Sequence, residues 1–118
     1  MTTLEPIQST LYDDFDDDID MIHKLICSFV EQTLPQTQQD MHQYFQSNDI
    51  TSLSNITHAI KGTAGGFGYL PMTDLLLEME NTIASGNMHQ LSELIGEFNI
   101  MCERIYLGHS QYIQTCTQ

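Results

Sequence analysis

A segment in the middle of the chain holds a histidine and a lysine at a spacing that suits phosphoryl chemistry. It spans residues 56–68 and reads Ile-Thr-His-Ala-Ile-Lys-Gly-Thr-Ala-Gly-Gly-Phe-Gly. If the segment is helical, Lys61 lies one turn from His58 on the same side. A neutral imidazole nitrogen is a nucleophile, and a lysine close by offsets the charge of a phosphoryl group placed on it. The pair therefore indicates a phosphoryl-accepting histidine; the alternative is an ordinary surface histidine beside a surface lysine.

The helix that would carry His58 turns this histidine away from the core. Its apolar residues form one stripe at helical spacing, and His58 lies about 180° from the centre of that stripe. The residues near His58 on the polar side are small, and glycines inside a helix cost on the order of 0.5–1 kcal/mol each relative to alanine. We therefore expect close approach of a partner protein at Ser54, Gly62 and Gly65.

The segment resembles the signature of histidine-containing phosphotransfer (HPt) domains of bacterial two-component phosphorelays. That pattern is His, Lys three residues on, Gly at four, Ser or Thr at five and Gly at ten, and His58 to Gly68 matches every position. The resemblance implies a helical bundle in which His58 is phosphorylated and Lys61 stabilises the phosphate. It also implies partners that are response-regulator receiver domains or hybrid sensor kinases. The domain would need no cofactor of its own, since the receiver supplies the magnesium and the reacting aspartate.

Glu80 is a further candidate, on the helix that should pack antiparallel beside the His58 helix. It lies about 100° from the apolar Met79, so its side chain could reach the flank of His58. The stretch from His58 to Glu80 also resembles, without a gap, the phosphotransfer domain of chemotaxis histidine kinases. There the matching glutamate hydrogen-bonds the imidazole nitrogen that is not phosphorylated. The alternatives are a solvated surface glutamate at position 80, or Glu78 in its place.

Composition restricts the class of protein. The chain has 118 residues, of which 41% are hydrophobic, enough for a single modest core. A net charge of −13 argues against nucleic acids and anionic membranes as partners.

No apolar run reaches the roughly 18 residues of a membrane span, and no signal peptide is recognisable. Three cysteines, an odd number, fit a reducing compartment. We expect a cytoplasmic protein and, by default, a monomer.

Hydrophobic periodicity predicts an all-α fold, an antiparallel four-helix bundle with an additional N-terminal helix. We expect a lead-in segment at 1–17, the bundle at 18–114 and a tail at 115–118. The acidic run at 13–20 should cap the first helix; it lacks the glycine and glutamate of an EF-hand loop. Pro35 should end that helix near residue 33 and start the next. Asp49 should cap the His58 helix, Gly68 should end it, and residues 108–118 should fray after a further turn.

The remaining histidines do not suggest chemistry of their own. No two of these histidines are four residues apart, and we expect no cysteine at a metal-ligand spacing from them. We therefore predict no metal site. These residues are His23, His42, His89 and His109. The chain also has no Walker motif or kinase glycine loop, so we expect no ATP-dependent kinase activity.

The sequence thus leads to a phosphorelay intermediate as its main hypothesis. His58 would take a phosphoryl group from a receiver aspartate and give it to another receiver. Two alternatives stay open: a substrate domain of a chemotaxis-type histidine kinase, and a non-phosphorylated scaffold that binds receivers. Whether the chain is free-standing or belongs to a larger kinase also stays open.

Overall fold

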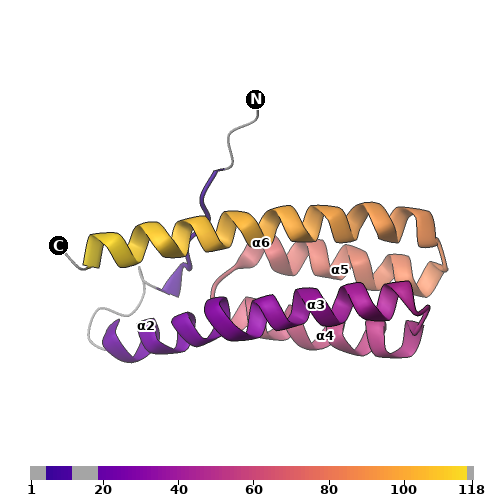
Figure 1. Cartoon of the computed structure of the whole chain (residues 1–118), viewed down its shortest axis with the longest axis horizontal. Helices are drawn as coiled ribbons and strands as arrows, with labels where there is room; N and C mark the ends of the chain where they lie inside the picture. The colour runs from indigo at the N-terminus through magenta and orange to yellow at the C-terminus, as the bar shows by residue number, and fades with distance from the viewer. Residues whose placement is uncertain (1–4, 12–18, 117–118) are drawn as a thin grey trace.

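Helices account for nearly all of the chain that the computed structural model describes, which is residues 5–11 and 19–116. They follow one another as rods joined by short turns (Figure 1). In chain order they are α2 (Ile19–Ser28), η1 (Phe29–Thr33), α3 (Leu34–Gln46), α4 (Ile50–Gly66), α5 (Leu70–Ser85) and α6 (Met88–Cys116). The predicted all-α fold is confirmed.

Pro35 lies in the first turn of α3, as predicted, but the predicted break is wrong, because the first three elements form a single uninterrupted rod. Proline has no N–H, and its ring clashes with the carbonyl four residues back in an α-helix. Here η1 is a π-helix, in which the Leu34 N–H bonds to the Phe29 carbonyl five residues back. This wider turn accommodates the proline. Phe29, Val30 and Leu34 are all buried, so packing also holds the rod continuous.

The helices α3 to α6 pack as an antiparallel bundle whose turns are set by local sequence. Asp49 caps α4 by accepting a hydrogen bond from the Ser52 N–H at 3.2 Å. Gly68, with φ of 79°, occupies the left-handed region in the turn after α4. Asn87 accepts from the Gln90 N–H at 3.1 Å ahead of α6. The caps expected at Asp49 and Gly68 are thus confirmed.

The last helix is longer than predicted. Fraying was expected one turn after residue 107, but α6 continues without interruption to Cys116. Ile105, Gly108 and His109 are buried, which anchors this part of α6. In Figure 1, α2 and the C-terminal end of α6 extend together beyond α4 and α5.

Residues 5–11, the strap, cross the bundle and hold it at two places. On α6, the Ile7 N–H donates to the Arg104 carbonyl at 3.0 Å, and a Cβ added at Gly108 would lie 2.1 Å from the Ile7 oxygen. At the α4–α5 turn, the Thr10 N–H donates to the Gly68 carbonyl at 3.3 Å. This part of the predicted lead-in therefore packs on the bundle; the acidic run at 13–18 lies outside the described residues.

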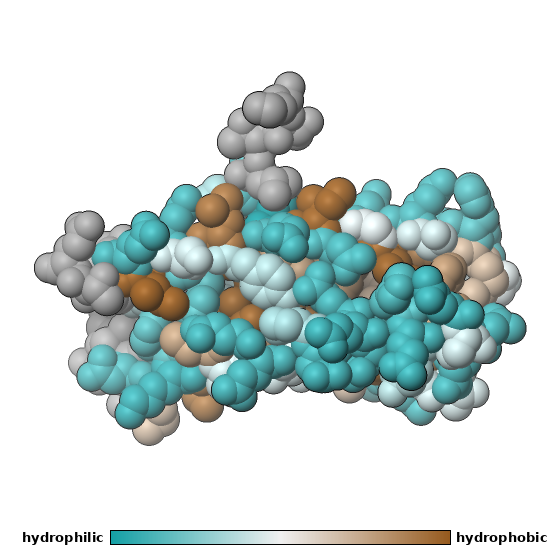
Figure 2. All heavy atoms as spheres, viewed as in Figure 1, coloured by the Kyte–Doolittle hydropathy of each residue, from teal (hydrophilic) through white to brown (hydrophobic). Residues whose placement is uncertain are grey.

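The face of the molecule seen in Figure 2 is largely polar. Figure 2 shows hydrophilic residues over most of the viewed face, with apolar residues in separate small patches. Within the described ranges, no helix combines the length and the hydrophobicity that crossing a membrane requires.

Candidate functional site

His58 projects from the side of α4 that faces away from the core. Leu53 and Ile60 on the opposite side are 0% and 3% exposed, whereas the His58 side chain is 76% exposed. The helical period of the apolar residues places the imidazole in solvent, as the sequence predicts. A second protein can therefore reach the ring.

Glu80 joins His58 to Lys61. Its Oε1 lies 3.1 Å from His58 Nδ1, and its Oε2 accepts a hydrogen bond from Lys61 Nζ at 3.0 Å. α5 packs directly against α4, and this register brings the carboxylate between the two basic side chains. Glu80 and Lys61 are 21% and 23% exposed, so both are far less accessible than the histidine. The structure thus brings together all three residues for which the sequence suggested chemistry.

The contacts of Glu80 keep its carboxyl group ionised. Partial burial raises the pKa of Glu80, but the hydrogen bonds and charges of Lys61 and His58 outweigh this effect. The net pKa of Glu80 lies below its ordinary value. A carboxylate that is ionised near neutral pH accepts hydrogen bonds from both neighbours.

This arrangement fixes which imidazole nitrogen is available for reaction. A neutral imidazole carries its proton on the nitrogen that faces an acceptor. Since Glu80 faces Nδ1, that nitrogen holds the proton and Nε2 keeps its lone pair. The site therefore presents one nucleophilic nitrogen, with an ammonium group one helical turn away.

The small residues predicted to face a partner differ in their surroundings. A Cβ added at Gly62 would have no atom within 4 Å, so the fold itself does not require glycine there. At Gly65, an added Cβ would lie 3.3 Å from Thr73 Oγ1, so the close approach of α5 to α4 accounts for this glycine within the chain. Ser54 is partly exposed on α4. Glu78, the competing carboxylate, is exposed and takes no part in the His58 contacts.

The structure also gathers residues that the sequence analysis passed over. Cys27, Glu31 and His109 each offer a metal-ligand atom, and these atoms all lie within 4.8 Å of one another. A signal was present, because His23, Cys27 and Glu31 follow at i, i+4 and i+8 on one face of a helix. The expectation that no cysteine lies at a ligand spacing from a histidine is therefore wrong for Cys27, which follows His23 by four residues, whereas the contribution of His109 depends on the tertiary fold.

A comparison with protein-family models finds a match to the family described as Hpt domain, over residues 10–106. This range contains the segment around His58 as well as Glu80. No curated protein and no solved structure matches the chain.

Proposed function

The chain belongs to the Hpt domain family, a family of histidine phosphotransfer in two-component signalling, and we propose that His58 is its phosphoryl-accepting residue. In this proposal the domain is a relay intermediate. It accepts a phosphoryl group from the aspartyl phosphate of one receiver domain and transfers it to the aspartate of another. Proteins of this family interact with receiver domains and kinases, so the coarse class of partner follows from the family.

The proposed transfer is a displacement at phosphorus. The lone pair of His58 Nε2 attacks the phosphorus atom, the bond from phosphorus to the aspartate oxygen breaks, and the carboxylate leaves with the electron pair. The proton on Nδ1 stays with the ring and faces Glu80. Because the imidazole gains positive charge as the new bond forms, its hydrogen bond to the carboxylate strengthens in the transition state.

Lys61 and Gly62 have supporting parts in this proposal. The ammonium group of Lys61 stabilises the charge of the phosphorylated histidine, while its bond to Glu80 keeps it close to the ring. Gly62 leaves an open surface one turn from His58, where a receiver can approach. Ser54 and Gly65 complete the proposed docking surface. We expect the magnesium ion to come with the receiver, as in phosphoryl transfer generally.

One observation carries the proposal. The His58 imidazole is exposed to solvent, while its Nδ1 contacts the partly buried carboxylate of Glu80. The test is to incubate the chain with a phosphorylated receiver domain and to measure acid-labile phosphate on the chain. His58→Gln should abolish the signal. His89→Gln is the matched control, because His89 is also exposed and lies 3.2 Å from Glu93. Phosphorylation that persists in His58→Gln would refute the assignment.

The same experiment addresses the scaffold alternative. A receiver that binds the wild-type chain and His58→Gln equally, without any phosphate appearing on the wild type, would favour a non-phosphorylated scaffold. Phosphorylation of the wild type alone would favour the relay.

A further inference from the structure

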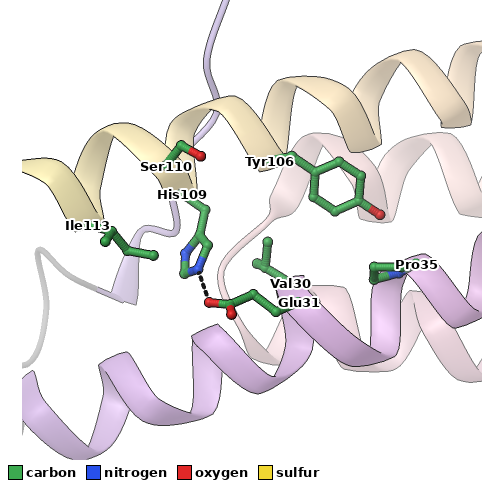
Figure 3. A pocket seen from close by; sticks show the side chains of 7 residues that line it. All are labelled: Val30, Glu31, Pro35, Tyr106, His109, Ser110 and Ile113. Atoms are coloured by element: carbon green, nitrogen blue, oxygen red, sulfur yellow. Dashed lines mark hydrogen bonds and ion pairs between the residues drawn. The ribbon is translucent and has the colours of Figure 1, made fainter.

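A second group of reactive side chains lies at the end of the molecule formed by α2, η1 and the C-terminal half of α6. Cys27 comes from α2, Glu31 from η1 and His109 from α6. In Figure 3, His109 and Glu31 point toward each other across the space between the helices. His109 Nε2 lies 2.8 Å from Glu31 Oε2. The phosphotransfer proposed above uses none of these residues.

We propose that Cys27, Glu31 and His109 form a binding site for a zinc-like divalent cation. A thiolate, a carboxylate and an imidazole are all zinc ligands, and sulfur together with nitrogen favours zinc over magnesium or calcium. The cation would link α2 and η1 to α6, residues that lie up to 82 positions apart in the chain (Cys27 to His109). The cysteine thiol would lose its proton to solvent as the metal–sulfur bond forms.

The present spacing of the ligand atoms is close to what such an ion needs. Tetrahedral coordination with bonds of about 2.0–2.3 Å separates neighbouring ligand atoms by about 3.3–3.8 Å. The Glu31 and His109 atoms are now 2.8 Å apart, and all three ligand atoms lie within 4.8 Å of one another. Small side-chain rotations would therefore complete the site without moving the helices.

The burial of His109 supports a role beyond an ordinary surface ion pair. Its side chain is only 6% exposed, and its Nδ1 is buried without a hydrogen-bond partner among the described residues. A buried nitrogen without a partner is unfavourable. A cation bound at Nε2, beside Glu31, would leave this Nδ1 as it is, so the support for the site comes from the burial of the ring next to the Glu31 carboxylate.

Access and charge also favour a cation. A cavity of about 480 Å³ opens beside the Glu31–His109 pair, with Val30, Pro35 and Tyr106 among its lining residues (Figure 3). It gives an ion a path to the ligands. The net charge of −13 attracts cations to the molecule. The fourth coordination position would be open to water or to His23, whose Nε2 lies 3.5 Å from Cys27 Sγ.

The test uses the full chain, kept reduced and stripped of metal with a chelator. Titration with Co²⁺ should give an absorption band of sulfur-to-cobalt charge transfer that saturates at one ion per chain, and Zn²⁺ should displace the cobalt. Cys27→Ser should abolish the band. Glu31→Gln and His109→Gln should each weaken Zn²⁺ binding by on the order of 10–100-fold or more, measured against a chromophoric competitor.

Two variants serve as controls. His89→Gln removes an exposed histidine that lies near a glutamate, and His58→Gln removes the proposed phosphoryl acceptor. Both should bind Co²⁺ and Zn²⁺ as the wild type does. Circular dichroism of each metal-free variant checks that it is folded, and the three ligand variants provide independent tests if one of them is not.

The proposal would be overturned by a wild-type chain that takes up no stoichiometric Zn²⁺ at micromolar concentrations. It would equally be overturned if folded Cys27→Ser and His109→Gln bound the ion as tightly as the wild type. A loss of binding in His58→Gln would place the ion at the other histidine and would also refute it.

Discussion

Replacing Glu80 by glutamine tests whether the carboxylate contributes to the reaction of His58. The substitution keeps the size of the side chain and an oxygen that can accept from Nδ1 at 3.1 Å, but it removes the charge. A hydrogen bond to a charged group contributes about 1.5–3 kcal/mol and one between neutral groups about 0.5–1.5 kcal/mol. Because His58 is 76% exposed, solvent reduces this difference, and we take about 1 kcal/mol. The rate of phosphorylation should then fall about fivefold.

The assay should need no natural partner. Phosphoramidate transfers its phosphoryl group to histidine directly, so the rate of appearance of phosphohistidine measures the nucleophilicity of the ring itself. Phosphorus NMR should also show that the wild type is phosphorylated on Nε2, because Nδ1 faces Glu80.

The matched control is Glu78→Gln. Glu78 is exposed on the same helix, and its substitution changes the net charge by the same amount. It therefore measures the general effect of removing one negative charge on the approach of an anionic donor. If the Glu80→Gln and Glu78→Gln variants are phosphorylated at the same rate, the Glu80 carboxylate does not assist His58 and the reasoning fails.

Three further predictions concern the fold and its surface. Gly62→Ala should stabilise the chain by up to about 1 kcal/mol in urea unfolding, since an added Cβ meets nothing within 4 Å. The same substitution should slow phosphoryl transfer from a receiver but leave transfer from phosphoramidate unchanged. Gly108→Ala should destabilise the chain and release the strap, because the new Cβ would lie 2.1 Å from the Ile7 oxygen. The release should appear as faster amide exchange at residues 5–11. Gly96→Ala is the control, because Gly96 is an open position of α6 and its substitution should have neither effect. The lowered pKa of Glu80 means that its contacts add stability above its ordinary pKa of 4.5 and lose it as the pH falls through the lower, folded value. Unfolding of the wild type and Glu80→Gln between pH 3 and 7 should therefore converge at the acidic end, and a constant difference would contradict the assignment.

The sequence by itself determined the features that depend on neighbouring residues. The helical period of Leu53 and Ile60 was sufficient to place His58 in solvent, because burial of one face decides where the opposite face points. The cap at Asp49 and the left-handed residue at Gly68 were also predictable, since each acts within one turn of its own helix.

Only the tertiary structure decided the features that join distant segments. That Glu80 rather than Glu78 meets His58 depends on the register of α5 against α4, which no local pattern specifies. The helix continues through Pro35 because buried neighbours and a π turn outweigh the local preference for a break. The approach of His109 to Glu31, 78 residues away, follows from the packing of α6 on the first rod, because such a contact requires the whole bundle to form.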